Sequence, residues 1–213
     1  MITGCFNQGT ITNTGKPSSY AYSTGGIAGS ISTGVTVERC GNTGNITSTL
    51  KRIGGIAGSA GGTINACFNT GTITGIYGVG GIAGDSGTSD AKVTGCYNTG
   101  DVKGVSPSAS FNDTNAKGIG GIIGGVSGTS SKVSVSGCYN MGAVSNTSKL
   151  TDITVGGIIG CSAAKNYSGA VTGNLATAVN CWYLDTAAEQ GDGYNKNASG
   201  ITAKTAKQIA DGD

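Results

Sequence analysis

The stretch Cys67-Phe68-Asn69-Thr70-Gly71-Thr72-Ile73 decides how this chain is interpreted, because close copies of it recur along the sequence. The copies begin at Cys5, Cys40, Cys96 and Cys138, and a decayed copy begins at Cys181. A second block, Gly-Gly-Ile-x-Gly, lies between the copies, and its isoleucines are Ile27, Ile56, Ile82, Ile122 and Ile158. The chain is therefore an array of repeated units, and this fact outweighs any single residue in predicting the fold.

Composition narrows the class of protein. Glycine supplies 41 of the 213 residues and proline only 2, which separates the chain from collagen and from Pro-rich disordered tracts. Charged residues are 11% of the total, the net charge is +2, and Lys and Arg are scattered singly apart from Lys51-Arg52. Nothing here supports nucleic-acid binding. No stretch approaches the ~20 consecutive apolar residues of a transmembrane helix.

The positions held constant around each Cys predict short strands. An aliphatic or small residue stands three places before the Cys, and an Ile or Val stands six places after it. The first row is Ile2, Val37, Ile64, Val93, Val135 and Ala178; the second is Ile11, Ile46, Ile73, Val102 and Val144, with Ala187 in the decayed copy. β-Branched residues at fixed offsets, broken by Gly and Asn, indicate strands joined by tight turns.

Fixed blocks separated by spacers of different length indicate stacked strands with variable loops at the corners. The shortest repeats, about 26 to 29 residues, suit one coil of a β-solenoid, and stacked coils bury what a single coil cannot. We therefore predict an all-β fold, a β-solenoid (parallel β-helix) of about five to six coils. At about 4.8 Å per coil the rod is roughly 25–30 Å long.

The prediction divides the chain into solenoid repeats over 1–180 and a C-terminal cap, or lead-in to a following domain, over 181–213. Within the cap a short helix is expected, with Thr202 as its N-cap and Gly212 just past its end. The chain begins inside a repeat, with no Gly-Gly-Ile block before Cys5. We expect it to be a fragment of a longer protein with flanking domains.

Glycine and asparagine have structural explanations in such a coil. The Gly pairs are expected to supply positive φ at corners and close backbone approach in a narrow interior. One Asn stands two places after each Cys: Asn7, Asn42, Asn69, Asn98 and Asn140. Stacked Asn side chains can hydrogen-bond from coil to coil, or each Asn can adopt the left-handed conformation in a turn. A binding array is the alternative.

The aromatic residue after each Cys forms another row. Its members are Phe6, Phe68, Tyr97, Tyr139 and Trp182, interrupted by Gly41. Packing between coils is the expected role, and a stripe facing carbohydrate is the alternative.

The cysteines are predicted to be buried thiols that act as small hydrophobic side chains. Six stand at the repeat position, and Cys161 is extra. Zinc-type spacing is absent and the chain has no His. A disulfide, such as one between Cys161 and Cys181, is the alternative.

The chain carries no recognisable catalytic constellation. The absence of His removes Ser-His-Asp and Cys-His catalysis. Of the carboxylates only Asp185, Glu189 and Asp192 cluster, in the cap, where solvated turns are the expected explanation and a calcium site the alternative. No cofactor is predicted.

The paired blocks, Gly-Gly-Ile-Ala-Gly followed by Ile-x-x-Cys-Phe/Tyr-Asn-Thr-Gly-x-Ile/Val, resemble the GLUG-motif repeats. The resemblance covers about residues 1 to 185. Those repeats occur in large bacterial surface and secreted proteins, including adhesin-like proteins and the non-catalytic part of some immunoglobulin A-cleaving metallopeptidases. The resemblance implies a β-solenoid on the cell exterior, and no protease activity carries over, since the zinc-binding helix motif is missing here.

The function predicted is a non-enzymatic structural or adhesive module that binds a protein or glycan of a host or neighbouring cell. Binding is expected on the longest internal loops, 103–119 and 145–155. The candidate binding residues are Lys103, Ser106, Phe111, Asn112, Asp113 and Lys117.

Two other functions remain open. Parallel β-helices host polysaccharide-degrading enzymes that use carboxylates, although the Asp and Glu residues here are scattered. Ice binding would use a flat row of Thr such as Thr10/Thr12 and Thr72/Thr74, but Lys103 and Ser145 break that row.

Overall fold

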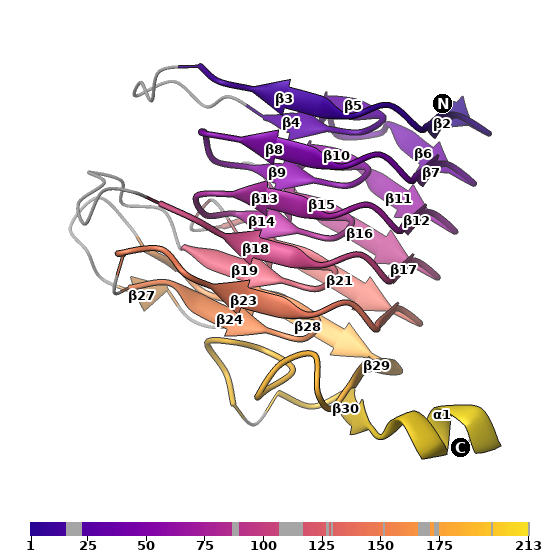
Figure 1. The fold of residues 1–213 in the computed structure, drawn as a ribbon, viewed down its shortest axis with the longest axis vertical. Helices are drawn as coiled ribbons and strands as arrows, with labels where there is room; N and C mark the ends of the chain where they lie inside the picture. Colours follow the sequence, from indigo (N-terminus) through magenta and orange to yellow (C-terminus); the bar gives the residue numbers. More distant parts are fainter. Residues whose placement is uncertain are drawn as a thin grey trace.

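The protein is a β-solenoid, seen in a computed structural model in which the coils stack along the long axis of the molecule (Figure 1). The structure describes residues 1–15, 23–86, 90–106, 117–126, 128, 130–150, 152–165, 171–172, 175–196 and 198–212. The predicted all-β fold with parallel strands is confirmed.

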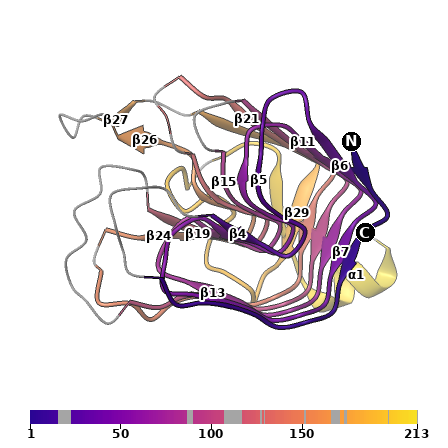
Figure 2. The ribbon, with the colours of Figure 1, turned by 90° about the horizontal axis from the view of Figure 1, so that it is seen from above.

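Five parallel sheets, here called sheets A to E, run along the stack, and each of the first five coils contributes one strand to each sheet (Figure 2). Sheet A contains β1 (Ile2–Thr3), β6 (Thr36–Glu38), β11 (Thr63–Asn65), β16 (Ala91–Thr94), β21 (Val133–Ser136) and β28 (Ala176–Val179). Sheet B contains β2 (Phe6–Asn7), β7 (Gly41–Asn42), β12 (Phe68–Asn69), β17 (Tyr97–Asn98), β22 (Tyr139–Asn140), β29 (Cys181–Leu184) and β30 (Ile201–Lys204). Sheet C contains β3 (Ile11–Asn13), β8 (Ile46–Ser48), β13 (Ile73–Gly75), β18 (Val102–Gly104) and β23 (Val144–Asn146).

The remaining two sheets, D and E, lie in the middle of the coil, between sheet A and sheet C (Figure 2). Sheet D contains β4 (Thr24–Gly25), β9 (Ile53–Gly54), β14 (Val79–Gly80), β19 (Gly118–Gly120) and β24 (Thr154–Gly156). Sheet E contains β5 (Ala28–Ile31), β10 (Ala57–Ala60), β15 (Ala83–Asp85), β20 (Ile123–Gly125) and β25 (Ile159–Cys161). A separate antiparallel hairpin joins β26 (Ala164–Lys165) to β27 (Val171–Thr172), and α1 (Ala206–Asp211) ends the described chain.

The residues of each aliphatic row predicted from sequence pair with one another in the register of one sheet. Ile64 pairs with Val37 and Val93 in sheet A, and Ile73 pairs with Ile46 and Val102 in sheet C. Sheets A, B and E enclose the main core, and sheets C and D enclose a second, smaller one. Side chains that repeat at fixed offsets therefore fill two continuous cores, which no single coil could build.

The Gly-Gly pairs let neighbouring backbone segments approach closely, as predicted. None of these glycines has a positive φ, so the prediction of a left-handed corner is wrong for them. A Cβ on Gly55 would lie 2.3 Å from the Gly81 carbonyl oxygen and 2.6 Å from the Asn69 side chain. The turn from sheet D to sheet E thus inserts into the interior and meets the Asn row there. This contact explains why the two sequence blocks recur together.

Positive φ occurs instead at the residue just before the repeated Cys. The φ angles there lie between 49° and 65°, at Gly4, Arg39, Ala66, Gly95, Gly137 and Asn180. The left-handed conformation predicted for the Asn row is likewise wrong, because those Asn residues belong to the strands of sheet B. The tight corner lies between sheets A and B, and the sequence varies at it.

The C-terminal segment differs from the predicted helix at its start. Residues Ile201–Lys204 form β30, which pairs in parallel with β29 so that Ile201 stands beside Cys181. The helix begins later, with Thr205 as N-cap: its side chain accepts a hydrogen bond from the Gln208 N–H in a capping box. Gly212, with φ 82°, ends the helix as expected. The unpaired edge of β29 offers a hydrogen-bonding ladder, and pairing with it overrides local helix preference.

Candidate functional site

The loops predicted to bind leave the solenoid at one corner, between sheets C and D. Lys103 lies on β18, is 43% exposed and pairs with Asp101 at 3.0 Å. Ser106 and Lys117, at the two ends of the loop, are buried. Phe111, Asn112 and Asp113 lie outside the described residues.

A buried cation joins the loop 103–119 to the loop 145–155. Lys117 Nζ lies 2.9 Å from Asp152 Oδ2 and 5.8 Å from the centre of the Tyr77 ring. Backbone bonds add to this, since the Thr154 N–H donates to the Lys117 carbonyl at 3.0 Å and the Lys149 N–H donates to Ser106 at 3.2 Å. The stems of both loops are therefore fixed to each other and to the coil below them.

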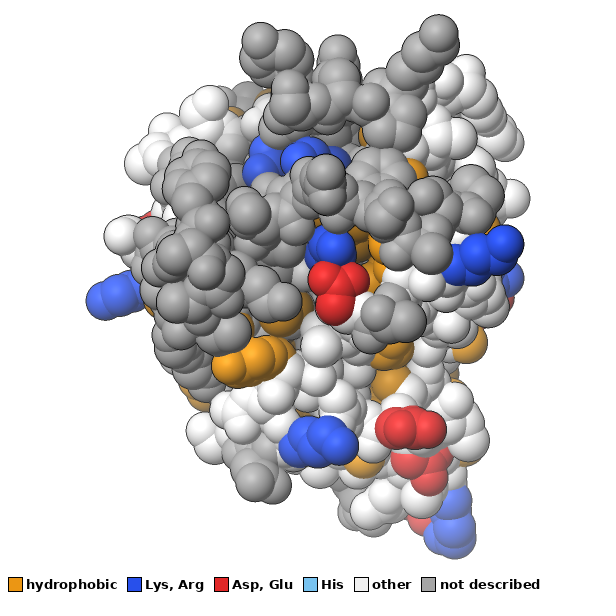
Figure 3. Space-filling model, turned by 90° about the vertical axis from the view of Figure 1, so that its left-hand side faces the viewer, with side chains coloured by type: hydrophobic (Ala, Val, Ile, Leu, Met, Phe, Trp, Pro, Cys, Tyr) orange, Lys and Arg blue, Asp and Glu red, His pale blue; other side chains and the backbone are white. Residues whose placement is uncertain are grey.

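Apolar side chains support these stems. Ile76, Tyr77 and Leu150 form a small buried cluster against which Ile153 packs. Arg52 and Asp85 form a second ion pair, at 2.6 Å, with both side chains largely buried. Figure 3 shows this face, where basic side chains are spread over the surface and one of them, near the centre, lies against an acidic side chain.

Sequence reasoning missed Tyr77, Asp152 and the Arg52–Asp85 pair. These residues come from different coils, and each occurs once rather than in a row. Lys117 and Asp152 stand in adjacent copies of the same corner. An alignment of the coils by strand register could therefore have suggested that these two side chains meet.

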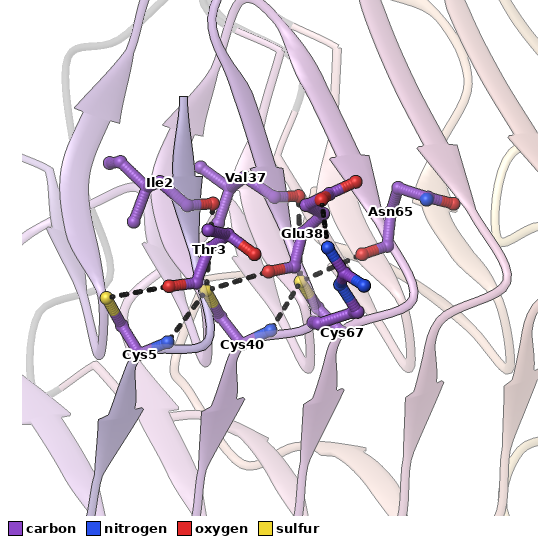
Figure 4. Close-up of polar contacts among 9 residues, drawn as sticks. Ile2, Thr3, Cys5, Val37, Glu38, Cys40, Asn65 and Cys67 are labelled. Atoms are coloured by element: carbon purple, nitrogen blue, oxygen red, sulfur yellow. Dashed lines mark hydrogen bonds and ion pairs between the residues drawn. The ribbon is translucent and has the colours of Figure 1, made fainter.

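The cysteine row lies inside the solenoid (Figure 4). All seven cysteines, Cys161 and Cys181 included, are thiols outside any disulfide, and all but Cys5 are buried. From Cys5 to Cys96, each N–H of the row donates to the sulfur of the next coil, as from Cys40 to Cys67 Sγ at 3.4 Å. The Cys67 thiol donates to the Asn65 carbonyl at 3.2 Å. Burial raises the pKa of the Cys40 thiol. These thiols act as packing and hydrogen-bonding groups.

The Asn row is a continuous chain of amide hydrogen bonds. Asn69 Nδ2 donates to Asn98 Oδ1 at 2.7 Å and to the Gly71 carbonyl at 2.8 Å. The same pair of bonds recurs at Asn42 and Asn98. Four of the five Asn side chains are fully buried, so the row stabilises the stack and is not open to a ligand.

The aromatic row lies on the outside of sheet B, with its rings stacked on one another. The ring centroids of Phe68 and Tyr97 lie 5.4 Å apart, those of Tyr97 and Tyr139 5.1 Å, and those of Tyr139 and Trp182 4.5 Å. Lys204 Nζ covers the far face of Trp182 at 5.6 Å. At Gly41 the Phe6 and Phe68 rings lean over the gap, 6.2 Å apart. Because the ring faces contact each other, mainly ring edges are left for a sugar to meet.

The acidic cluster of the cap divides into two parts. Asp185 and Glu189 are exposed, whereas Asp192 is 1% exposed, forms a bridge with Ile159 and accepts a hydrogen bond from the Tyr194 N–H at 2.9 Å. The interpretation of Asp192 as part of a solvated turn is therefore wrong. It occupies the next place in the row of Ala83, Ile123 and Ile159, so a further coil persists where the sequence repeat has decayed.

Asp185 and Glu189 line a groove of about 630 Å³ at the C-terminal end. Its other lining residues are Val144, Ser145, Asn146, Ile153, Thr154, Val155, Thr186, Ala187, Ala188, Gln190 and Gly193. Across the described part of the chain, no three His, Cys, Asp or Glu side chains gather as metal ligands would.

The Thr row proposed for ice binding covers only part of sheet C. Thr12, Thr47 and Thr74 stand in register, and Lys103 and Ser145 follow them. The flat face is broken where the sequence predicts.

Comparisons with protein-family models, with curated proteins and with solved structures find no match. Within the described residues no helix has the length and hydrophobicity needed to cross a lipid bilayer.

Proposed function

We propose that this chain is a non-enzymatic module of a secreted or cell-surface bacterial protein, which binds a protein or glycan of a host or neighbouring cell through the loops at the C–D corner. The observation that carries the proposal is the anchoring of these loops. Segments of variable length leave the regular stack at the C–D corner, and the Lys117–Asp152 pair with Tyr77 fixes two of them. Rigid scaffolds that present variable loops are a common design for binding.

The resemblance to GLUG-motif repeats supports the same proposal. A solenoid separates its cores from its loops, so loop sequence can change without loss of the fold. The low charge, 11% of residues, and the uncharged polar surface suit an extracellular repeat protein.

The test is a glycan and matrix-protein binding array with the purified chain and with one loop exchange. In coil 3 the strands β13 and β14 are joined by Ile76-Tyr77-Gly78, whereas residues 105–117 precede the equivalent Gly118 in coil 4. Replacing 105–117 by Ile-Tyr gives coil 4 the short connection of coil 3 and keeps its strands in register. A specific hit that the exchange abolishes supports the proposal.

The control is folding of the exchange variant, followed by far-UV circular dichroism and by its urea midpoint. A ligand that binds both proteins equally would place the site elsewhere. Absence of binding to every probe would contradict the adhesive role and leave a passive stalk.

A further inference from the structure

The groove at the C-terminal end is lined by Val144–Asn146, Ile153–Val155, Asp185–Gln190 and Gly193, and it exists because sheets C and D have no strand in the sixth coil. Sheets A and B continue into a sixth coil through β28 and β29, and sheet B adds β30 as a seventh strand. Sheets C and D end at β23 and β24, the strands of the fifth coil. The segment 185–193 passes beside these two edges without forming a strand on either.

The backbone of β23 is paired at its start and open beyond it. The Val144 N–H donates to the Ala187 carbonyl at 2.8 Å, on the side of the sixth coil. The Thr147 N–H donates to the Gly104 carbonyl at 2.9 Å, on the side of the fourth coil. In a parallel strand alternate residues bond to opposite neighbours, so Asn146 presents its N–H and carbonyl to the groove.

The edge of β24 is satisfied by a side chain rather than by a strand. Gln190 Nε2 lies 3.5 Å from the Val155 carbonyl and donates to the Gly193 carbonyl at 2.9 Å. The Gly157 N–H donates to the Gln190 carbonyl at 2.7 Å, which closes the far end. Between these ends a short stretch of sheet edge remains available for pairing.

The side chains that line the groove indicate which kind of partner it fits. Val144, Ile153, Val155 and Ala188 supply apolar surface, and the lining includes no Lys or Arg. Asp185 and Glu189 are exposed carboxylates at the groove and take part in no ion pair with another described side chain. A volume of about 630 Å³ lies within the usual range for a binding site.

We propose that this groove binds an extended peptide segment of a partner protein, which adds to the edge of β23 as a further strand and places Lys or Arg beside Asp185 and Glu189. Main-chain bonds to the open edge supply affinity, and alternate side chains of the peptide enter the apolar groove. The groove includes the two ends of the loop 145–155 but none of residues 105–117, which the loop exchange replaces, so either proposal can fail without the other.

The probe is a fluorescent hexapeptide, acetyl-Thr-Val-Thr-Val-Lys-Lys-amide, titrated against the whole chain by fluorescence anisotropy at low salt. We expect binding that weakens at least tenfold with 0.5 M NaCl. Replacing both Lys by Glu should abolish binding, and N-methylation of alternate peptide nitrogens should reduce affinity at least tenfold, because the methyl groups block strand pairing.

Variants of the protein locate the site. Asp185→Asn with Glu189→Gln should weaken binding about tenfold, and Ala188→Trp should fill the groove and abolish binding. Asp101→Asn is the matched control, since it removes an exposed carboxylate that does not line the groove and should leave affinity unchanged.

Three outcomes would overturn the proposal. One is no binding of the basic peptide; the second is equal binding of the N-methylated peptide or of the groove variants that remain folded by circular dichroism. The third is concentration-dependent dimers in sedimentation velocity that Ala188→Trp dissociates, which would make the occupant a second copy of the chain.

Discussion

At the residue scale, the corner before each Cys requires a left-handed backbone, and the sequence meets this requirement unevenly. Gly95 and Gly137 adopt it without a Cβ, whereas Ala66 (φ 49°) and Arg39 (φ 51°) adopt it despite one. A non-Gly residue there costs about 1–2 kcal/mol, part of which the greater freedom of Gly in the unfolded chain offsets. We therefore expect Ala66→Gly to raise the free energy of unfolding by about 0.5–1 kcal/mol.

Urea denaturation followed by circular dichroism measures this change. Ala57→Gly is the control, because Ala57 lies in a strand with ordinary φ and a fully buried side chain, so this substitution should destabilise. If Ala66→Gly destabilises as much as the control, the corner does not have the conformation described.

The Asn row gives a second prediction at this scale. Asn98 is fully buried and its Nδ2 donates to both Asn140 Oδ1 and the Gly100 carbonyl at 2.7 Å. Asn98→Asp keeps the shape but replaces the donor by an acceptor, which leaves buried carbonyl groups unpaired. We expect a loss of about 2–4 kcal/mol in the free energy of unfolding.

Asn7→Asp tests whether burial in the row is the cause. Asn7 begins the row and is only half-buried, so its replacement should cost less than about 1 kcal/mol. Equal losses at the two positions in urea denaturation would contradict the role of a continuous amide chain.

At the element scale, sheet B is held from outside by its stacked aromatic rings. Tyr139 lies between Tyr97 and Trp182, nearly parallel to both. Each such pair contributes about 0.5–1.5 kcal/mol beyond area burial, so Tyr139→Ala should lower the free energy of unfolding by about 2 kcal/mol or more. Trp182 is the only Trp of the chain, and its fluorescence should shift in the same variant.

Phe6→Ala is the matched control for this row. Phe6 is 63% exposed and its ring is tilted by 46° against Phe68, so its loss should cost under about 1 kcal/mol. A Tyr139→Ala variant as stable as Phe6→Ala would show that the stack is incidental.

Elements that repeat were predictable from sequence, and elements that occur once were not. Ile64, Asn69 and Ile73 mark strands because successive coils hold the same kind of residue at the same offset. Strand β30 has no such support: residues 202–204 have the local sequence of a helix start, and the open edge of β29 makes them a strand instead. The groove is harder still to predict from sequence, because it forms where sheets C and D have no strand in the sixth coil.

At the scale of the whole molecule, burial of phenols makes stability depend on high pH. Burial raises the pKa of Tyr183, with Asp185 adding to the effect, and burial together with Tyr97 raises the pKa of Tyr139. The folded state therefore holds these protons more tightly than the unfolded chain. The stability they contribute is fully present below pH ~10, the ordinary phenol pKa, and is lost as pH rises through the folded values.

Tyr183→Phe should therefore lose less stability than the wild type between pH 8 and pH 11.5, measured as the urea midpoint at each pH. Thiol ionisation affects both proteins alike, so the difference between them reports the phenol. Tyr194→Phe, at a 45% exposed position, is the control and should follow the wild type. Parallel pH profiles for all three proteins would contradict the linkage.

The repeat also implies that a whole coil can be removed. Cys96 and Cys138 stand in equivalent places, each preceded by a glycine with φ near 60°, so deletion of residues 96–137 joins Gly95 to Cys138 at matching corners. Sheet registers then place Asn69 on Asn140, Ile73 on Val144 and Val79 on Val155. Because contacts in a solenoid run only between neighbouring coils, we expect a folded protein with one coil fewer, cooperative unfolding and a smaller urea m-value.

The comparison that decides this prediction is a deletion longer by one residue. Removing 96–138 takes the repeated Cys as well, shifts the following strand by one place and turns its core side chains outward. The shorter deletion should keep the far-UV spectrum of a β protein, and the longer one should lose it or aggregate. Were both to fold equally well, register would not be set by the rows of Cys, Asn and Ile, and the stack would not be the modular array from which the loop exchange and the open end at β23 are argued.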